Sequence, residues 1–80
     1  NGPEINLRIP ALIPDDYLPD VHSRLILYKR IAGVKNEDAL DELQVEMIDR
    51  FGLLPDATKN LFSLQQLKLQ AQSFTPSWYK

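Results

Sequence analysis

Five carboxylates in the middle of the chain are the first candidates for a chemical role: Asp38, Asp41, Glu42, Glu46 and Asp49. Paired carboxylates act as general acid and base when a desolvated pocket shifts their pKa values. Their spacing, however, places Glu42, Glu46 and Asp49 on the polar side of an expected helix, where carboxylates are solvated. We therefore do not expect catalysis from these residues.

His22 is the only histidine, and three aspartates lie near it in the sequence: Asp15, Asp16 and Asp20. A His/Asp metal site is conceivable, but no third or fourth ligand stands at a recognised spacing. Ser23 and His22 do not form a nucleophile–base pair, because adjacent residues of a helix point about 100° apart. The sequence therefore predicts no metal site, no cofactor and no enzyme active site in this chain.

Lys29, Arg30 and Lys35 form the only basic cluster of the sequence. They fall at the end of an expected helix, where cations suit the negative end of the helix dipole. The glycines are far apart, so no phosphate-binding loop is present, and the aromatic residues do not interleave with the basic ones. A small helical nucleic-acid-binding domain that uses these three residues remains the alternative function.

The composition is that of a small globular domain. The 80 residues are 44% apolar and 25% charged, which provides for one domain with a single layer of core. The net charge of −2 gives no general attraction to nucleic acid or to an anionic membrane. There is no cysteine, no signal-peptide pattern and no apolar run near the roughly 18 residues of a membrane span. We expect a cytoplasmic protein.

The apolar periodicity predicts a mainly α fold with three helices, over residues 18–33, 36–51 and 55–73. Residues 5–9 alternate apolar and polar side chains, which is typical of a half-buried strand. No later segment alternates in this way, so either this segment lies against the helices as an extended arm or the chain is a fragment of a larger α/β regulatory domain, and we expect the fragment. The expected organisation is an extended segment at 1–16, a three-helix unit at 17–74 and a tail at 75–80.

Each expected helix has one apolar stripe, and together the stripes define the expected core. Its centre should consist of the following residues: Leu25, Tyr28, Leu43, Met47, Phe51, Leu61 and Leu64. Phe62 and Leu69 lie off the stripe of the third helix and would be exposed in a bare three-helix packing. Their position suggests a second covered surface.

A tight corner between the second and third helices is predicted by residues 47–56, MIDRFGLLPD. Gly52, which follows the stripe residue Phe51, can adopt the positive φ that ends a helix, and Leu53 can fold back onto Ile48. Pro55 suits the first turn of the next helix, because its missing N–H costs nothing there. Chemistry alone therefore predicts that one helix ends and the next begins within four residues.

With these elements placed, the chain from about residue 4 to residue 72 resembles the C-terminal domain of the bacterial transcription-repair coupling factors. The matching runs are residues 8–17 (RIPALIPDDY), 24–25 (RL), 28–32 (YKRIA) and 46–55 (EMIDRFGLLP). Each run is short, but their order and spacing together are specific. The sequence departs from the family pattern at residues 73–80, where the family continues into further strands and helices.

The resemblance implies a parent protein that is an ATP-driven DNA translocase, which displaces stalled RNA polymerase and recruits the repair protein UvrA. The family's C-terminal domain is regulatory, and it docks on a UvrB-like module of the same chain and masks the UvrA-binding surface. The family's docking contact corresponds here to Glu46, Asp49 and Arg50. The resemblance thus implies a non-enzymatic, autoinhibitory interaction domain.

Overall fold

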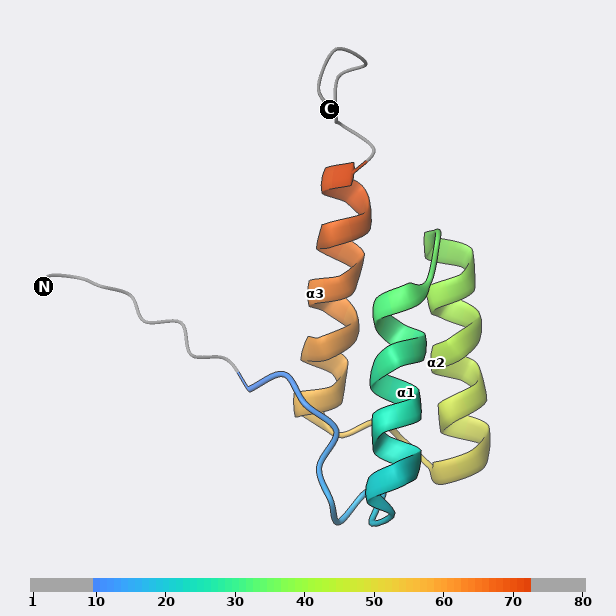
Figure 1. The fold of residues 1–80 in the computed structure, drawn as a ribbon, viewed down its shortest axis with the longest axis vertical. Coiled ribbons are helices and arrows are strands. Elements are labelled where there is room, and N and C mark those ends of the chain that lie inside the picture. Colours follow the sequence, from blue (N-terminus) through green and yellow to red (C-terminus); the bar gives the residue numbers. More distant parts are fainter. Residues whose placement is uncertain (1–9, 73–80) are drawn as a thin grey trace, which may run out of the picture.

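Residues 10–72 are described by a computed structural model, and within this range the chain forms three α-helices and no strand. The helices are α1 (Val21–Gly33), α2 (Glu37–Phe51) and α3 (Asp56–Gln72). Figure 1 shows them side by side, with α1 and α3 running in one direction and α2 in the other. The predicted mainly α fold is confirmed, whereas the strand predicted at residues 5–9 and the tail at 75–80 lie outside the described residues.

The starts of α1 and α2 are set by side-chain caps. Asp20 accepts hydrogen bonds from the backbone N–H and the hydroxyl of Ser23, at 2.9 and 2.7 Å, and Asn36 accepts one from the N–H of Ala39 at 2.8 Å. The first helix was predicted from residue 18 but begins at Val21, because Asp20 caps it and the preceding residues form a separate turn. No helix of residues 10–72 has the length and apolar character needed to cross a bilayer.

The core lies between the three helices and the segment that precedes them. Its buried apolar residues are Ile13, Leu18, Leu27, Ile31, Leu40, Leu43, Met47, Leu54, Phe62 and Leu69. Leu43 and Met47 occupy the core as predicted. Tyr28, Phe51 and Leu61 are half-buried and pack against its edge rather than at its centre.

Four residues have the opposite exposure from the one that the apolar stripes predict. Leu25 and Leu64 were expected in the core but are 54% and 46% exposed. Phe62 and Leu69, for which a second covered surface was inferred, are 2% and 8% exposed and belong to the same core as the other helices' buried residues. Both α1 and α3 carry apolar residues around much of their circumference, so the sequence does not fix which side faces inward. In the structure, the side of α3 that faces the core is the one that carries Thr58, Phe62 and Leu69, and Thr58 is fully buried.

The segment before α1 is fixed to the helices by hydrogen bonds. The N–H of Leu12 donates to the carbonyl of Ala57 at 3.1 Å, and the hydroxyl of Thr58 donates to the carbonyl of Leu12 at 3.0 Å. The N–H of Ile13 donates to the Tyr28 hydroxyl oxygen at 2.7 Å. The described part of the predicted extended segment therefore covers one end of the bundle and buries Ile13.

Candidate docking site

The three residues predicted to form the docking contact, Glu46, Asp49 and Arg50, all lie in the last turns of α2. The Glu46 carboxylate binds two guanidinium groups. Arg30 of α1 donates from Nη1 and Nη2 to Oε2 and Oε1, both at 2.8 Å, and Arg50 donates from Nη1 to Oε2 at 3.4 Å. Asp49 is exposed and makes no ion pair with any described residue. Glu46 therefore differs from Asp49 in being already paired, in what we term the Arg30–Glu46–Arg50 cluster.

This pairing changes the electrostatics of the predicted contact. The hydrogen bonds from Arg30 hold the pKa of the Glu46 carboxyl at about 2, well below its ordinary value of 4.5, and Arg50 acts in the same direction. The same hydrogen bonds raise the pKa of the Arg30 guanidinium. With two guanidinium groups and one carboxylate, the cluster carries a net positive charge, so Glu46 does not present a free negative charge to a partner.

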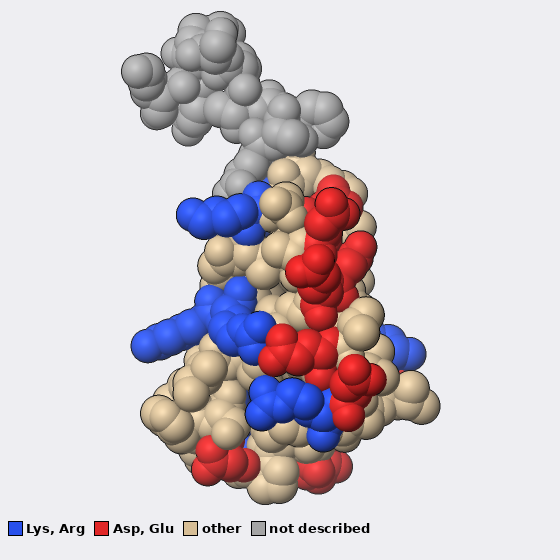
Figure 2. Space-filling model, turned by 90° about the vertical axis from the view of Figure 1, so that its right-hand side faces the viewer, with Lys and Arg blue, Asp and Glu red and all other residues tan. Residues whose placement is uncertain are grey.

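The two surfaces weighed as alternatives from the sequence are neighbours in the structure. Figure 2 shows a column of acidic side chains beside a column of basic ones on the face formed by α1 and α2. The exposed acidic residues of α2 are Glu37, Asp38, Asp41, Glu42 and Asp49, and the exposed basic residues at the end of α1 and just after it are Lys29, Arg30 and Lys35. Arg30 is thus a member of the basic cluster predicted from the sequence, and in the structure it binds Glu46 of the predicted docking contact.

A pocket of about 150 Å³ lies between α1 and α2 next to the cluster. Its polar lining residues are Ser23, Arg30 and Arg50, and its apolar lining residues are Ile26, Leu27 and Phe51. The Arg50 guanidinium also lies over the Phe51 ring, 4.9 Å from the ring centroid, which is a cation–π contact. The pocket is therefore lined by both cationic and apolar side chains.

The predicted corner after α2 is present, with two differences in detail. Gly52 has a φ of 103°, as expected, and its N–H donates to the carbonyl of Ile48 at 2.9 Å. Leu53 was expected to fold back onto Ile48 but is 84% exposed, because the ψ of −176° at Gly52 directs the chain away from the helix. Pro55 was expected in the first turn of α3 but directly precedes Asp56, and its carbonyl accepts from two N–H groups of that turn, at 3.0 Å each.

Tyr17 holds this corner, a role that the sequence did not indicate. Its hydroxyl donates to the carbonyl of Gly52 at 2.8 Å and lies 3.4 Å from that of Met47, and its ring packs edge-on against Phe51 with centroids 6.1 Å apart. Tyr17 stands in an irregular segment 35 residues before Gly52, so no periodicity or local motif links the two. The contact positions the end of α2, where Asp49 and Arg50 lie.

His22 does not combine with the nearby aspartates into a ligand set. Asp20 is occupied by Ser23 at the start of α1, and this hydrogen bonding lowers the pKa of the Asp20 carboxyl. Among residues 10–72, no group of three His, Cys, Asp or Glu side chains is arranged to hold a metal ion.

Comparison with known proteins decides the family. The family model described as the TRCF domain matches residues 7–76, which is most of the chain. The chain belongs to the TRCF domain family.

Two relatives of this TRCF domain are the transcription-repair-coupling factors of Haemophilus influenzae and Escherichia coli. The first is 64% identical over 66 residues, and the second is 55% identical over 69 residues. These matches cover 82% and 86% of this chain but only 6% of each relative, so the TRCF domain spans a small part of the relatives' length.

A solved structure described as the C-terminal domain of transcription-repair coupling factor has the same fold. It superposes on this TRCF domain with a TM-score of 0.75 at 38% sequence identity. The superposition covers 79% of this chain and 39% of the solved one. The family predicted from the matching runs at residues 8–17, 24–25, 28–32 and 46–55 is therefore confirmed.

Proposed function

We propose that this TRCF domain is a regulatory interaction module that docks on a UvrB-like module of its parent protein and masks the surface that binds UvrA. The parent would be an ATP-dependent DNA translocase that acts on stalled RNA polymerase during transcription-coupled repair. Family membership supports a role in coupling repair to transcription, and the correspondence of Glu46, Asp49 and Arg50 to the family's docking contact supports the regulatory part.

The observation that carries the proposal is the exposed acidic column on α2. Glu42 and Asp49 are exposed, and neither forms an ion pair with a described residue, so both are free to meet a basic surface. Charge complementarity of this kind sets the orientation of partners and excludes partners of the wrong sign. Arg50, the next residue after Asp49, lines the pocket between α1 and α2, so the end of α2 carries both an exposed carboxylate and part of the pocket wall.

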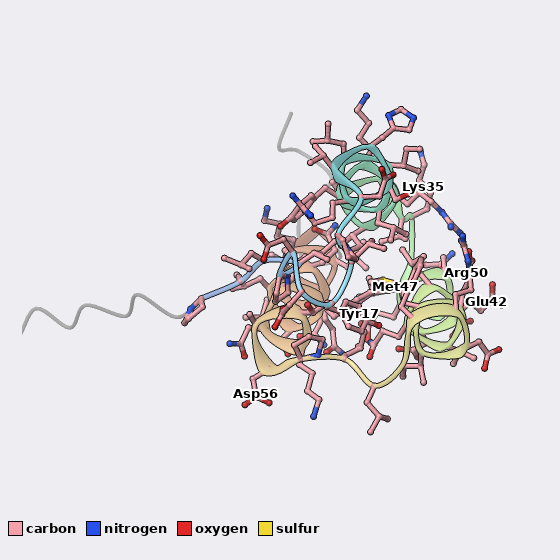
Figure 3. All side chains as sticks on the ribbon, turned by 90° about the horizontal axis from the view of Figure 1, so that it is seen from below. Tyr17, Lys35, Glu42, Met47, Arg50 and Asp56 are labelled. Atoms are coloured by element: carbon pink, nitrogen blue, oxygen red, sulfur yellow. The ribbon has the colours of Figure 1, made fainter. Side chains whose placement is uncertain are left out.

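The test reverses the free carboxylate in the full-length parent protein and measures UvrA binding by pull-down. Asp49→Lys should open the docked state and increase UvrA capture, because repulsion replaces attraction at the contact. Asp56→Lys is the matched control, since it makes the same charge change at the start of α3, away from the α2 residues Glu42 and Arg50 (Figure 3).

Glu46→Lys combined with Asp49→Lys should open the parent further, although this variant also removes the pairing partner of Arg30. Asp49→Lys is therefore the deciding variant. Equal capture of UvrA by the wild type and by folded Asp49→Lys would remove this side of α2 from the docking contact.

A further inference from the structure

The carboxylate of Glu46 has little capacity left for a partner. An ionised carboxylate offers about four lone-pair positions on its two oxygens. Three of them are used, because Oε1 accepts from Arg30 and Oε2 accepts from both Arg30 and Arg50. A partner's basic group that needs both oxygens of Glu46 therefore cannot bind while Arg30 remains in place.

From this geometry we infer that Arg30 regulates docking by competing with the partner for Glu46. In the free domain the two hydrogen bonds from Arg30 occupy both carboxylate oxygens of Glu46. Docking therefore requires a basic group of the partner to displace the Arg30 guanidinium. This inference rests on the proposed docking function. It assigns Arg30 a role opposite to that of an ordinary interface residue, because removing its side chain should strengthen docking.

The competition can be separated from a general charge effect, because the chain offers a matched residue. Lys29 is the neighbour of Arg30 in α1, is exposed and forms no ion pair with a described residue. Arg30→Gln and Lys29→Gln remove the same charge from adjacent positions and should change long-range attraction to a basic partner equally. Only Arg30→Gln removes the forked contact and leaves Oε1 of Glu46 without a donor, while Arg50 stays on Oε2 in both variants, so the difference between the two variants reports the competition.

The experiment uses the 80-residue chain and a separately purified UvrB-like module from a member of the family, with affinity measured by calorimetry. Arg30→Gln should bind about two- to fivefold more tightly than Lys29→Gln, a change of the size that an exposed ion pair produces. In a Glu46→Gln background the advantage should disappear, because there is no longer a carboxylate to release. Arg30→Lys, which keeps the charge but loses the forked geometry, should lie between the wild type and Arg30→Gln.

A second readout follows the Glu46 carboxyl directly by NMR titration. Its pKa is about 2 in the wild type, and it should rise in Arg30→Gln but not in Lys29→Gln. Circular dichroism confirms that each variant is folded, and Arg30→Lys serves in place of Arg30→Gln if the latter unfolds.

Three results would overturn the inference. An equal gain in affinity for the UvrB-like module in Arg30→Gln and Lys29→Gln would mean that the loss of one positive charge explains the whole effect. Weaker binding by Arg30→Gln would make Arg30 a direct contact of the partner. Absence of binding by the wild-type chain itself would refute the proposed function, and this outcome is distinct because the first two leave wild-type binding intact.

Discussion

Gly52 is the residue whose backbone conformation decides how α2 joins α3. Its φ of 103° lies in a region that side chains rarely adopt, and a Cβ added there would meet no atom within 4 Å. The effect of substitution should therefore come from backbone strain alone. Gly52→Ala should destabilise the domain by about 1–3 kcal/mol, measured by urea denaturation.

Gly33 is the control for this prediction, since a Cβ there would also meet no atom within 4 Å, and its φ is not positive. Gly33→Ala should be neutral or stabilise the domain by up to about 1 kcal/mol, because alanine is favoured over glycine in a helix. Similar destabilisation by both substitutions would show that φ at Gly52 is not the controlling factor.

The Tyr17 hydroxyl provides a second prediction at the scale of single residues. Tyr17→Phe keeps the ring against Phe51 but removes the hydrogen bond to the Gly52 carbonyl. The loss should be about 0.5–1.5 kcal/mol in the free energy of unfolding, the usual net contribution of one such bond. An unchanged urea midpoint would mean that water replaces the hydroxyl without loss.

Glu46 should make the stability of the domain depend on pH in the acid range. Its folded pKa of about 2 is below the ordinary 4.5, so the fold favours the ionised form. The stabilisation is therefore fully present above about pH 4.5 and is lost as the pH falls towards 2. Melting temperatures should be measured between pH 6 and pH 2 in steps of about one pH unit. They should fall less steeply for Glu46→Gln than for the wild type. Parallel curves would contradict the Arg30–Glu46 pair.

At the scale of elements, the rotation of α3 about its axis determines which large side chains stabilise the domain. Phe62 is 2% exposed and Leu67 is 60% exposed. Phe62→Ala should destabilise the domain by about 3–5 kcal/mol, as expected for a buried aromatic residue, whereas Leu67→Ala should stay within about 0.5 kcal/mol. Thermal melting of the two variants checks this, and comparable losses would show that α3 is rotated differently.

Phe51 illustrates the same point on α2. Its place on the apolar stripe predicts a central core residue, but it is half-buried and contacts Tyr17 and Arg50 at the edge. Phe51→Ala should therefore be less destabilising than Phe62→Ala, because less apolar surface returns to water.

At the scale of the whole molecule, the closeness of acidic and basic side chains on one face argues against the nucleic-acid-binding alternative. The basic side chains at the end of α1 adjoin the acidic column of α2 (Figure 2), and Arg30 is held by Glu46. Duplex DNA approaching Lys29 and Lys35 would also meet the carboxylates. We expect binding no tighter than about 10⁻⁴ M near physiological salt, the weak end of non-specific binding.

Fluorescence anisotropy with a short labelled duplex measures this affinity. Tighter binding that Lys29→Glu and Lys35→Glu abolish would support the alternative function. These two residues are the suitable probes, because Arg30→Glu would also break the pair with Glu46.

The sequence by itself determined the features that depend on neighbouring residues. The predicted ends of α1 at residue 33 and of α2 at residue 51 are the observed ones, and Gly52 follows α2 with the predicted positive φ, because such signals act within one helical turn. The matching runs between residues 8 and 55 also sufficed for the family, since their order and spacing along the chain carry that information.

Only the tertiary structure decided which sides of α1 and α3 are buried and which side chains meet across the helices. Leu25 and Leu64 were misplaced because several apolar stripes compete on each helix, and the total burial of all three helices selects one. Arg30 and Glu46 are 16 residues apart, and Tyr17 and Gly52 are 35 apart. Such contacts depend on helix rotation and on the path of the chain, which local sequence does not specify.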